Sequence, residues 1–465
     1  MKKYIIPFFL LIFFSQHAQD KMKDVLTLSE YLGYLKRYHP IVKQANLIIN
    51  NSEAKLLKAR GAFDPKIELD FNKKHFKENA YYTHLNGSFK IPTWYGIALK
   101  ANFEQNDGLF LNPENQGPVD GLYTAGISIS LARGMLTNKR MTTLKQAKFF
   151  VNQAKEEQQI LVNKILYNAS LSYFNWLKTY NEKRVFSSFL NNAKERFKGT
   201  KRAYEEGDKP AIDTLEAGIT LNSRRLGLEK ASIQLVQSSL ELSNYLWLNE
   251  NTPIELKENI IPDLNTFDAI DSCFNIGLFH NENFEVEQHP KIKELGFKIK
   301  SLAANKRLKM NNLLPKMDFQ YNFISPKAKQ LNSFNTNNYK AGIHFSLPLF
   351  IRKERGDFAL AKIQLQDKKL ENNASKVVIQ NKITAIHKEL ASYISQNDFT
   401  FKIVRDYGVL LSAEERKFFL GESSLLLVNY REQQYIDSKL KAIGLENDFF
   451  KAKARLFKAA VIAIN

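Results

Sequence analysis

The chain has 465 residues, of which 44% are apolar, so it is long enough to bury a sizeable core or to present a large apolar surface. Its net charge is +19, and a charge of this size raises the question of nucleic-acid binding. However, lysine and arginine are interspersed with acidic residues along helical stretches, and the sequence has no compact basic arm, zinc-finger or basic-zipper pattern. We therefore interpret the charge as that of solvated helix faces and expect no nucleic-acid partner.

The N-terminus has the pattern of a secretory signal peptide. Lys2 and Lys3 precede an apolar run over residues 4–14, and Ala18 follows at a suitable cleavage position. We expect residues 1–18 to be removed and the mature chain to be exported. The single cysteine, Cys273, excludes an intramolecular disulfide and a CxxC motif. No other stretch approaches the ~20 apolar residues of a membrane-spanning helix.

One segment of the mature chain, residues 40–72, recurs later in the sequence. Pro40 and Pro65 match Pro290 and Pro315 at the same offset of 250 residues (290 − 40 and 315 − 65). In both copies, helical spacing of apolar residues precedes the second proline and strict alternation follows it. This pattern predicts two tandem repeats, each with a helix that leads into a strand.

A histidine precedes the first proline of each copy. His39 and His289 stand at matching helix starts, so the pair suggests either a metal site or two helix caps. We favour a cap or first-turn role. Upstream, Thr27 and Glu30 have the spacing of a capping box and predict the start of a short helix.

Alternating segments predict strands with one polar and one apolar face. The expected strands are 66–72, 122–131, 316–323 and 342–347. Their apolar face would pack on a core in a soluble protein and would face lipid in a membrane barrel. The further pair 83–91 and 95–103 predicts either an extracellular extension or two more barrel strands. We favour the extension, because the second repeat lacks this pair.

Long stretches without helix breakers follow the strands in each repeat. Residues 136–206 contain one isolated glycine and predict a helix of about 105 Å, and the turn 207–210 precedes a return helix. The second repeat predicts helices over 357–420 and 424–463, joined at Gly421. The apolar tracts Leu144–Ile165 and Ile212–Leu240 are interpreted as an intramolecular coiled-coil seam, with a partner-binding face as the alternative.

The order of these features resembles the TolC-type outer-membrane efflux family over almost the whole mature chain. The resemblance rests on the signal peptide, the doubled helix–strand–hairpin plan, the turn glycines Gly207 and Gly421, and the segment Leu347–Phe350 that enters a long helix. It implies an α+β fold in which each protomer contributes a few strands to a membrane β-barrel, continued by very long antiparallel helical hairpins. The resemblance implies lipid-facing strands and a homotrimer.

The predicted organisation has three parts. Residues 1–18 are the signal peptide, residues 19–262 are the first repeat with its hairpin over 136–250, and residues 263–465 are the second repeat. The second repeat is expected to hold a linker, a helix over 290–312, strands over about 316–347 and a hairpin over 357–463.

The resemblance also implies a function. The protein would be a passive outer-membrane conduit, with a large periplasmic portion, that works with a periplasmic adaptor and an inner-membrane pump. It would not be an enzyme and would need no cofactor, and the sequence has no P-loop, HExxH or GxSxG motif. The alternative is a soluble, basic coiled-coil binding protein of the periplasm or cell surface. The sequence does not identify a cargo among drugs, metals, peptides and proteins.

Two sets of candidate site residues can be named, one for docking an adaptor and one for a gate. The turns are the natural contact for an adaptor, and their residues are Gly207, Asp208, Lys209, Pro210, Gly421, Glu422, Ser423 and Ser424. Family members carry acidic residues six and nine places after the second turn glycine, where this chain has Leu427 and Tyr430. The matching places after Gly207 hold Asp213 and Glu216, so the candidate gate comprises these four residues. The two carboxylates predict a cation-selective constriction, or else are ordinary first-turn acids.

Overall fold

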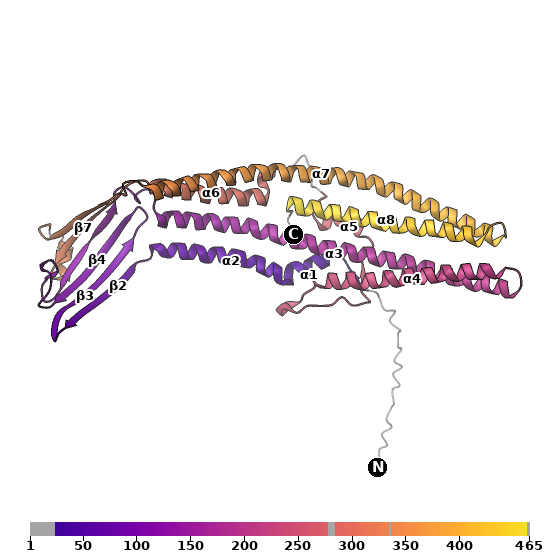
Figure 1. Cartoon of the computed structure of the whole chain (residues 1–465), viewed down its shortest axis with the longest axis horizontal. Helices are drawn as coiled ribbons and strands as arrows, with labels where there is room; N and C mark the ends of the chain where they lie inside the picture. The colour runs from indigo at the N-terminus through magenta and orange to yellow at the C-terminus, as the bar shows by residue number, and fades with distance from the viewer. Residues whose placement is uncertain (1–23, 278–283, 334–335, 463–465) are drawn as a thin grey trace, which may run out of the picture. The chain divides into compact units, whose positions relative to one another are not determined.

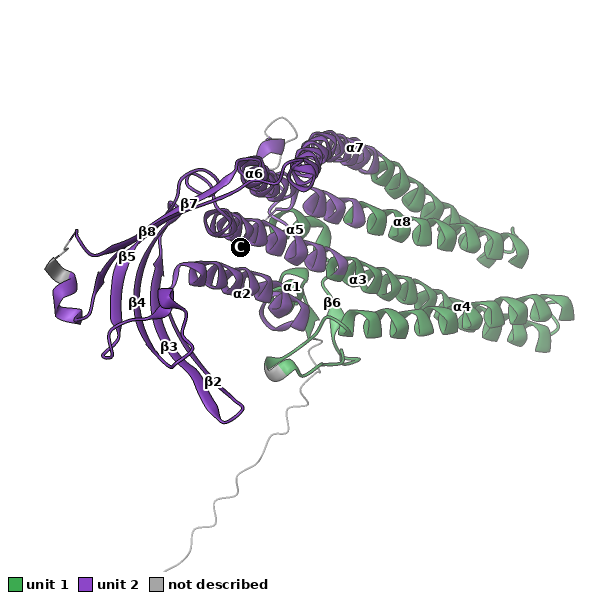
Figure 2. Cartoon of the chain, turned by 60° about the vertical axis from the view of Figure 1, so that its left-hand side comes forward, with its two compact units in different colours: residues 1–35, 169–273, 396–450 green, residues 36–168, 274–395, 451–465 purple. Residues whose placement is uncertain are grey.

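The computed structural model describes residues 24–277, 284–333 and 336–462 (Figure 1). The predicted signal peptide, residues 1–18, lies outside the described residues. The chain divides into two compact units, and each is assembled from three separate segments (Figure 2). Unit 1 comprises residues 1–35, 169–273 and 396–450, and unit 2 comprises residues 36–168, 274–395 and 451–465.

The fold is mainly helical with a smaller share of sheet. The helices are α1 (Leu28–Tyr38), α2 (Pro40–Arg60), α3 (Lys139–Glu205), α4 (Ala211–Ser243), α5 (Thr266–Cys273), α6 (Pro290–Asn311), α7 (Arg352–Phe419) and α8 (Leu425–Ala460). The strands are β1 (Val25–Leu26), β2 (Lys66–Phe76), β3 (Asn79–Pro92), β4 (Ile97–Asp107), β5 (Leu122–Ser130), β6 (Ile261–Pro262), β7 (Lys316–Ser325) and β8 (Tyr339–Ser346). Among the described helices, none is both long enough and apolar enough to cross a membrane.

Local capping signals in the sequence have the expected structural effect. At α1, the Glu30 N–H donates to Thr27 Oγ1 (3.2 Å) and the Thr27 N–H donates to Glu30 Oε2 (3.1 Å), which is a capping box. His39 and His289 each cap a helix with Nδ1, which accepts the N–H of Ile41 (3.2 Å) and of Lys291 (3.1 Å), respectively. The two histidines therefore have the capping role that the sequence favoured.

Unit 2 contains an antiparallel sheet of six strands in the order β2-β3-β4-β5-β7-β8. At the end of the sheet where β2 begins, α2 and α3 pack through Ala59, Leu144 and Ala147, with Phe63 and Trp94 against this cluster. The Asn138 side chain donates to the Trp94 carbonyl (2.9 Å), so the turn between β3 and β4 is fixed to the start of α3.

The expected extracellular extension is wrong. Strands β3 and β4 lie inside the sheet, where β3 pairs with β2 from Lys66 to Phe76 and β4 pairs with β5 from Ile97 to Glu104. The sheet of this chain therefore has six strands rather than the four that were expected. The physical reason is register, because the apolar positions of β3 and β4 fall on the same face as those of their neighbours and continue one apolar surface.

Unit 1 has a core of aromatic and small residues. The buried rings of Tyr31 and Tyr173 lie 5.8 Å apart, and the Tyr173 hydroxyl donates to the Leu26 carbonyl (2.8 Å). Towards the hairpin turns, Phe189 of α3 packs with Leu411 of α7 and with α8. Between α4 and α6, where a linker was expected, the described residues include β6 and α5.

The two apolar tracts that predicted a coiled-coil seam differ in how far they are buried. In α3, Leu144, Ala147, Ala154 and Ile165 are buried, but Leu144 and Ala147 pack on Ala59 of α2 rather than on the return helix. The intramolecular interpretation is wrong for α4, whose apolar stripe is 48–70% exposed in the protomer. The stripe residues are Ile212, Leu215, Ile219, Leu226, Ile233, Val236 and Leu240. The buried positions of α4 are other residues, several of them small or polar, namely Ala217, Leu221, Arg224, Ala231, Ser238 and Leu242.

Candidate functional site

The six-stranded sheet of unit 2 separates apolar from polar side chains. Alternation along each strand and the cross-strand register place most of the apolar residues of the six strands on one face, with Ala98 and Ile324 among the exceptions. On β2, Ile67, Leu69 and Phe71 are 81%, 70% and 62% exposed. On β8, Ile343 and Phe345 are also exposed. Within the protomer, this face is a large apolar surface rather than half of a core.

Both edges of this sheet are long. Among the described residues, β2 pairs only with β3 and β8 pairs only with β7, so the outer backbone groups of both strands have no strand partner. An open edge of this kind cannot stand in lipid, because its N–H and C=O groups would lack hydrogen bonds. Both edges are therefore open to pairing with another chain.

The two hairpin turns in unit 1 share one backbone design. Gly207 (φ +82°) and Gly421 (φ +79°) adopt the left-handed conformation that ends a helix. In each turn the next residue donates five residues back, from the Asp208 N–H to Ala203 (2.8 Å) and from the Glu422 N–H to Lys417 (2.9 Å). This is a Schellman motif, and it explains why glycine is needed at both positions.

The residues around the turns link the two hairpins and expose apolar groups. Lys209 Nζ lies 4.2 Å from the centre of the Phe418 ring, which is a cation–π contact between the first turn and the end of α7. Ser423 donates to Glu414, and the Ser424 hydroxyl accepts the Leu427 N–H (3.4 Å) at the start of α8. Pro210 precedes α4 without a side-chain cap. Phe419 is exposed beside the second turn.

The structure places the four candidate gate residues in different surroundings. The Glu216 carboxylate accepts the Asn429 amide N–H (3.1 Å), so it is tied to α8. Asp213 is partly exposed in the first turn of α4. Leu427 and Tyr430 of α8 are 46% and 55% exposed. Glu216 therefore belongs to a polar network that the sequence did not indicate.

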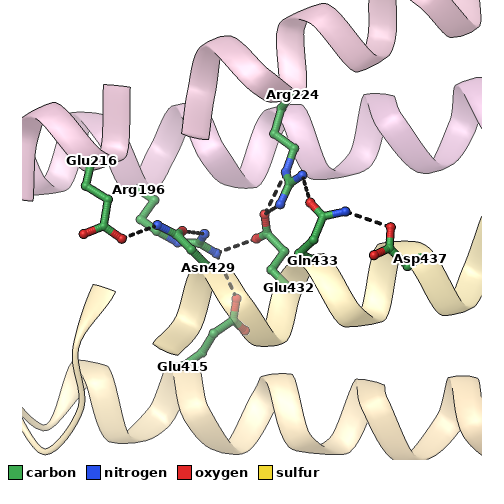
Figure 3. Close-up of polar contacts among 8 residues, drawn as sticks. All are labelled: Arg196, Glu216, Arg224, Glu415, Asn429, Glu432, Gln433 and Asp437. Carbon is green, nitrogen blue, oxygen red and sulfur yellow. Dashed lines mark hydrogen bonds and ion pairs between the residues drawn. The ribbon is translucent and has the colours of Figure 1, made fainter. Parts of the chain in front are cut away.

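That network is centred on one buried carboxylate (Figure 3). Glu432 of α8 is fully buried, and its two oxygens bind Arg196 Nη2 of α3 (2.7 Å) and Arg224 Nε of α4 (3.1 Å). Arg196 also donates to Asn429 (3.2 Å) and Glu415 (3.3 Å). The network thereby joins both helical hairpins within unit 1 (Figure 3).

The outer members of the network extend it along α8. Arg224 Nη1 donates to the Gln433 side chain (2.6 Å), which donates in turn to Asp437 (2.7 Å). The three central charges are those of Glu432, Arg196 and Arg224, and each thus has a defined partner, as a buried ion pair requires. Helical spacing did not indicate this network, because Arg224 lies on the face of α4 opposite to the apolar stripe that was expected to be buried.

Comparison with known proteins identifies the fold. No family model matches the chain, and no curated protein sequence matches it. Several solved structures do, including the CmeC outer-membrane channel of Campylobacter jejuni, with a TM-score of 0.65, 14% identity and coverage of 93% of this chain and 85% of that chain. For the outer-membrane protein VceC of Vibrio cholerae the TM-score is 0.64, the identity 12% and the coverage 94% and 97%.

The open state of the MtrE outer-membrane channel of Neisseria gonorrhoeae gives a TM-score of 0.64 at 12% identity, covering 94% of this chain and 89% of that chain. At these identities the comparison speaks to the fold. It agrees with the exposed apolar sheet face and with the two helical hairpins described above. The chain therefore has the fold of outer-membrane channel proteins, as its resemblance to the TolC-type family led us to expect.

Proposed function

We propose that the chain is the subunit of a channel in the outer membrane that serves as a passive exit duct of an envelope-spanning efflux or secretion system. The observation that carries this proposal is the sheet of unit 2, whose apolar face is exposed while its other face is polar. A sheet with one face for lipid and one for water is the building block of a membrane barrel. The fold shared with outer-membrane channels supports the same function.

The functional unit in this proposal is a homotrimer. Closing the sheet edges β2 and β8 against neighbouring copies removes the unpaired backbone groups that lipid does not tolerate. Three copies of a six-stranded sheet give a barrel of 18 strands (3 × 6), and barrels of about this size leave an aqueous channel. The exposed apolar stripe of α4 supports further contacts between copies.

The hairpin turns are the proposed docking site for a periplasmic adaptor, which connects the channel to an inner-membrane pump. Their matching backbone design and the exposed Phe419 support this assignment. Valine at both Gly207 and Gly421 would strain the left-handed backbone, so export should be lost while trimers still assemble. Asparagine at the same two positions is the control, because it tolerates this conformation. Normal export by the double valine variant would contradict the proposal that the turns dock an adaptor.

Asp213, Glu216, Leu427 and Tyr430 are the proposed constriction of the tunnel. Exposed Leu427 and Tyr430 would narrow it by their size, and Asp213 and Glu216 would add charge. Alanine at both apolar positions should raise the conductance of reconstituted trimers. An unchanged conductance would place the constriction elsewhere.

Cell fractionation tests the channel itself. A channel should sediment with the outer membrane, require detergent for extraction and migrate as a trimer after extraction. The competing function, a soluble coiled-coil binding protein, predicts release from the cell by osmotic shock. Release of the native protein by osmotic shock would reject the proposed function.

A further inference from the structure

A row of lysines crosses the polar face of the sheet in unit 2. Lys66 of β2 is the direct cross-strand partner of Lys90 of β3, and Lys90 is the partner of Lys100 of β4. The register then continues through two uncharged residues to a fourth lysine on β8. The complete row is Lys66, Lys90, Lys100, Gly126, Asn322 and Lys340.

The lysine row is electrostatically unfavourable within the single chain. Like charges directly opposite each other on neighbouring strands repel, and here two such pairs stand side by side. The row contains no carboxylate. Among the described residues, no acidic group lies within ion-pair distance of Lys66, Lys90 or Lys100.

The acidic residues of the polar face occupy other rows. Glu68 and Asp70 follow Lys66 along β2, and Glu104 of β4 shares a cross-strand row with Asp70, with Asn86 of β3 between them. Asp318 of β7 binds Lys316 (3.3 Å) and accepts the Ser130 hydroxyl (2.8 Å), and it partly offsets the repulsion between Lys100 and Lys90 without forming an ion pair with Lys100. The lysine row therefore keeps a local excess of positive charge, which an anion would compensate.

We propose that this lysine row is an anion-attracting site in the channel lumen and that the exported cargo carries negative charge. The inference rests on the proposed function, because the polar face lines the lumen only if the apolar face meets lipid. In a trimer the row contributes twelve lysines (3 × 4) to one lumen. Rings of lysine or arginine select anions by concentrating them in the pore.

The proposal makes a prediction opposite to that of the acidic gate. If Asp213 and Glu216 set the selectivity, the channel prefers cations. If the lysine row sets it, the channel prefers anions. The sign of the selectivity of the wild-type channel therefore separates the two mechanisms.

Reversal potentials in planar bilayers provide the first test. Full-length wild-type trimers under a potassium chloride gradient should prefer chloride. Lys66→Gln with Lys90→Gln and Lys100→Gln should lower the permeability ratio of chloride to potassium by about threefold or more. The control, with Lys145, Lys148 and Lys155 changed to glutamine, removes the same charge from exposed positions of α3 and should keep the wild-type ratio. A wild-type preference for potassium, or equal loss in both triple variants, would overturn the proposal.

A binding measurement tests the lysine row without requiring conduction. Pyrophosphate is titrated calorimetrically into the detergent-solubilised full-length protein. Low ionic strength is used, because at 0.1 M salt the Debye length is only about 10 Å and the attraction between exposed charges is screened beyond it. The sheet triple variant should bind about tenfold more weakly than the wild type and the α3 control. Equal affinity of all three proteins would overturn the anion site. Lysine-dependent binding by a protein that does not conduct would support the site and contradict the channel.

Discussion

Glu432 shows how a single buried charge can define the arrangement of long helices. Its carboxylate receives Arg196 from α3 and Arg224 from α4, so a shift of α8 along either helix would break at least one ion pair. Apolar packing alone tolerates sliding between helices better than directed hydrogen bonds do. Sequence periodicity did not predict this network, because the pairing joins residues 208 and 236 positions apart.

Removing the charge of Glu432 should destabilise the protein strongly. Glu432→Gln leaves two arginines beside a neutral amide in a buried site, and breaking a buried pair of this kind costs about 3–5 kcal/mol of unfolding free energy. Denaturant titration of the detergent-solubilised protein measures the change. The exposed pair Lys201–Glu205 (3.8 Å) provides the control, since Glu205→Gln should change stability by no more than ~0.5 kcal/mol. Equal effects of the two substitutions would contradict the assigned role of the network.

His289 should make stability depend on pH. Nδ1 accepts the Lys291 N–H and Nε2 contacts the Ala459 carbonyl (3.0 Å), a pattern that needs the neutral ring with its proton on Nε2. Burial lowers the pKa of His289, although the hydrogen bond to Ala459 acts in the opposite direction. Below about pH 6.5 the unfolded state therefore binds more protons than the folded state, and the unfolding free energy should fall as the pH decreases.

The matched variant for this pH effect is His289→Asn, because asparagine can still cap α6 but does not titrate in this range. Thermal unfolding of both full-length proteins between pH 7.5 and about pH 5 compares their slopes. The wild type should lose stability more steeply than the variant on acidification. Parallel curves would mean that His289 does not contribute to the pH dependence.

At the scale of elements, the sequence predicted the helix starts, strands and turns that depend on residues close together in the chain. Proline at the helix starts, alternation after Pro65 and Pro315, and glycine at the turns correspond to the observed α2, α6, β2, β7 and hairpin turns. The pairing of β3 and β4 was predicted wrongly, because comparison with the second repeat favoured an extension over sheet positions. Alternation establishes a strand with two faces, but it does not identify the neighbours of that strand.

The orientation of β2 leads to a prediction about lipid. Leu69 lies near the middle of this strand on the exposed apolar face, so Leu69→Arg should cost about 2–4 kcal/mol if that face meets the bilayer core. Folding into lipid vesicles, followed by denaturant titration, measures this cost. Asn72→Arg on the opposite face of the same strand is the control and should have little effect. Equal insertion of both variants would show that the apolar face does not contact lipid.

At the scale of the molecule, the exposed apolar stripe of α4 raises the question of whether another chain covers it. Helical spacing placed these residues on one face, but spacing alone does not tell whether the partner helix belongs to the same chain. In the protomer that face remains exposed, as does the heptad series Ile363, Leu370 and Val377 of α7 in unit 2, each 60–62% exposed. Exposed apolar stripes of this length are typical of surfaces that another chain covers.

In the proposed trimer, the stripe of α4 should therefore stabilise the assembly rather than the single chain. Ile233 and Gln234 are adjacent, and both are exposed in the protomer, so glutamate introduces the same charge at either position. If a neighbouring copy covers the stripe, Ile233→Glu buries an unpaired charge at the interface and should shift the detergent-solubilised protein from trimer to monomer, whereas Gln234→Glu should leave the trimer intact. Light scattering coupled to size-exclusion chromatography measures the mass, and the far-ultraviolet circular dichroism of the monomer should retain its helical signal because the substituted side chain has no role in the protomer core. A trimer that persists in the Ile233→Glu variant would place the subunit interface on another face of the helices.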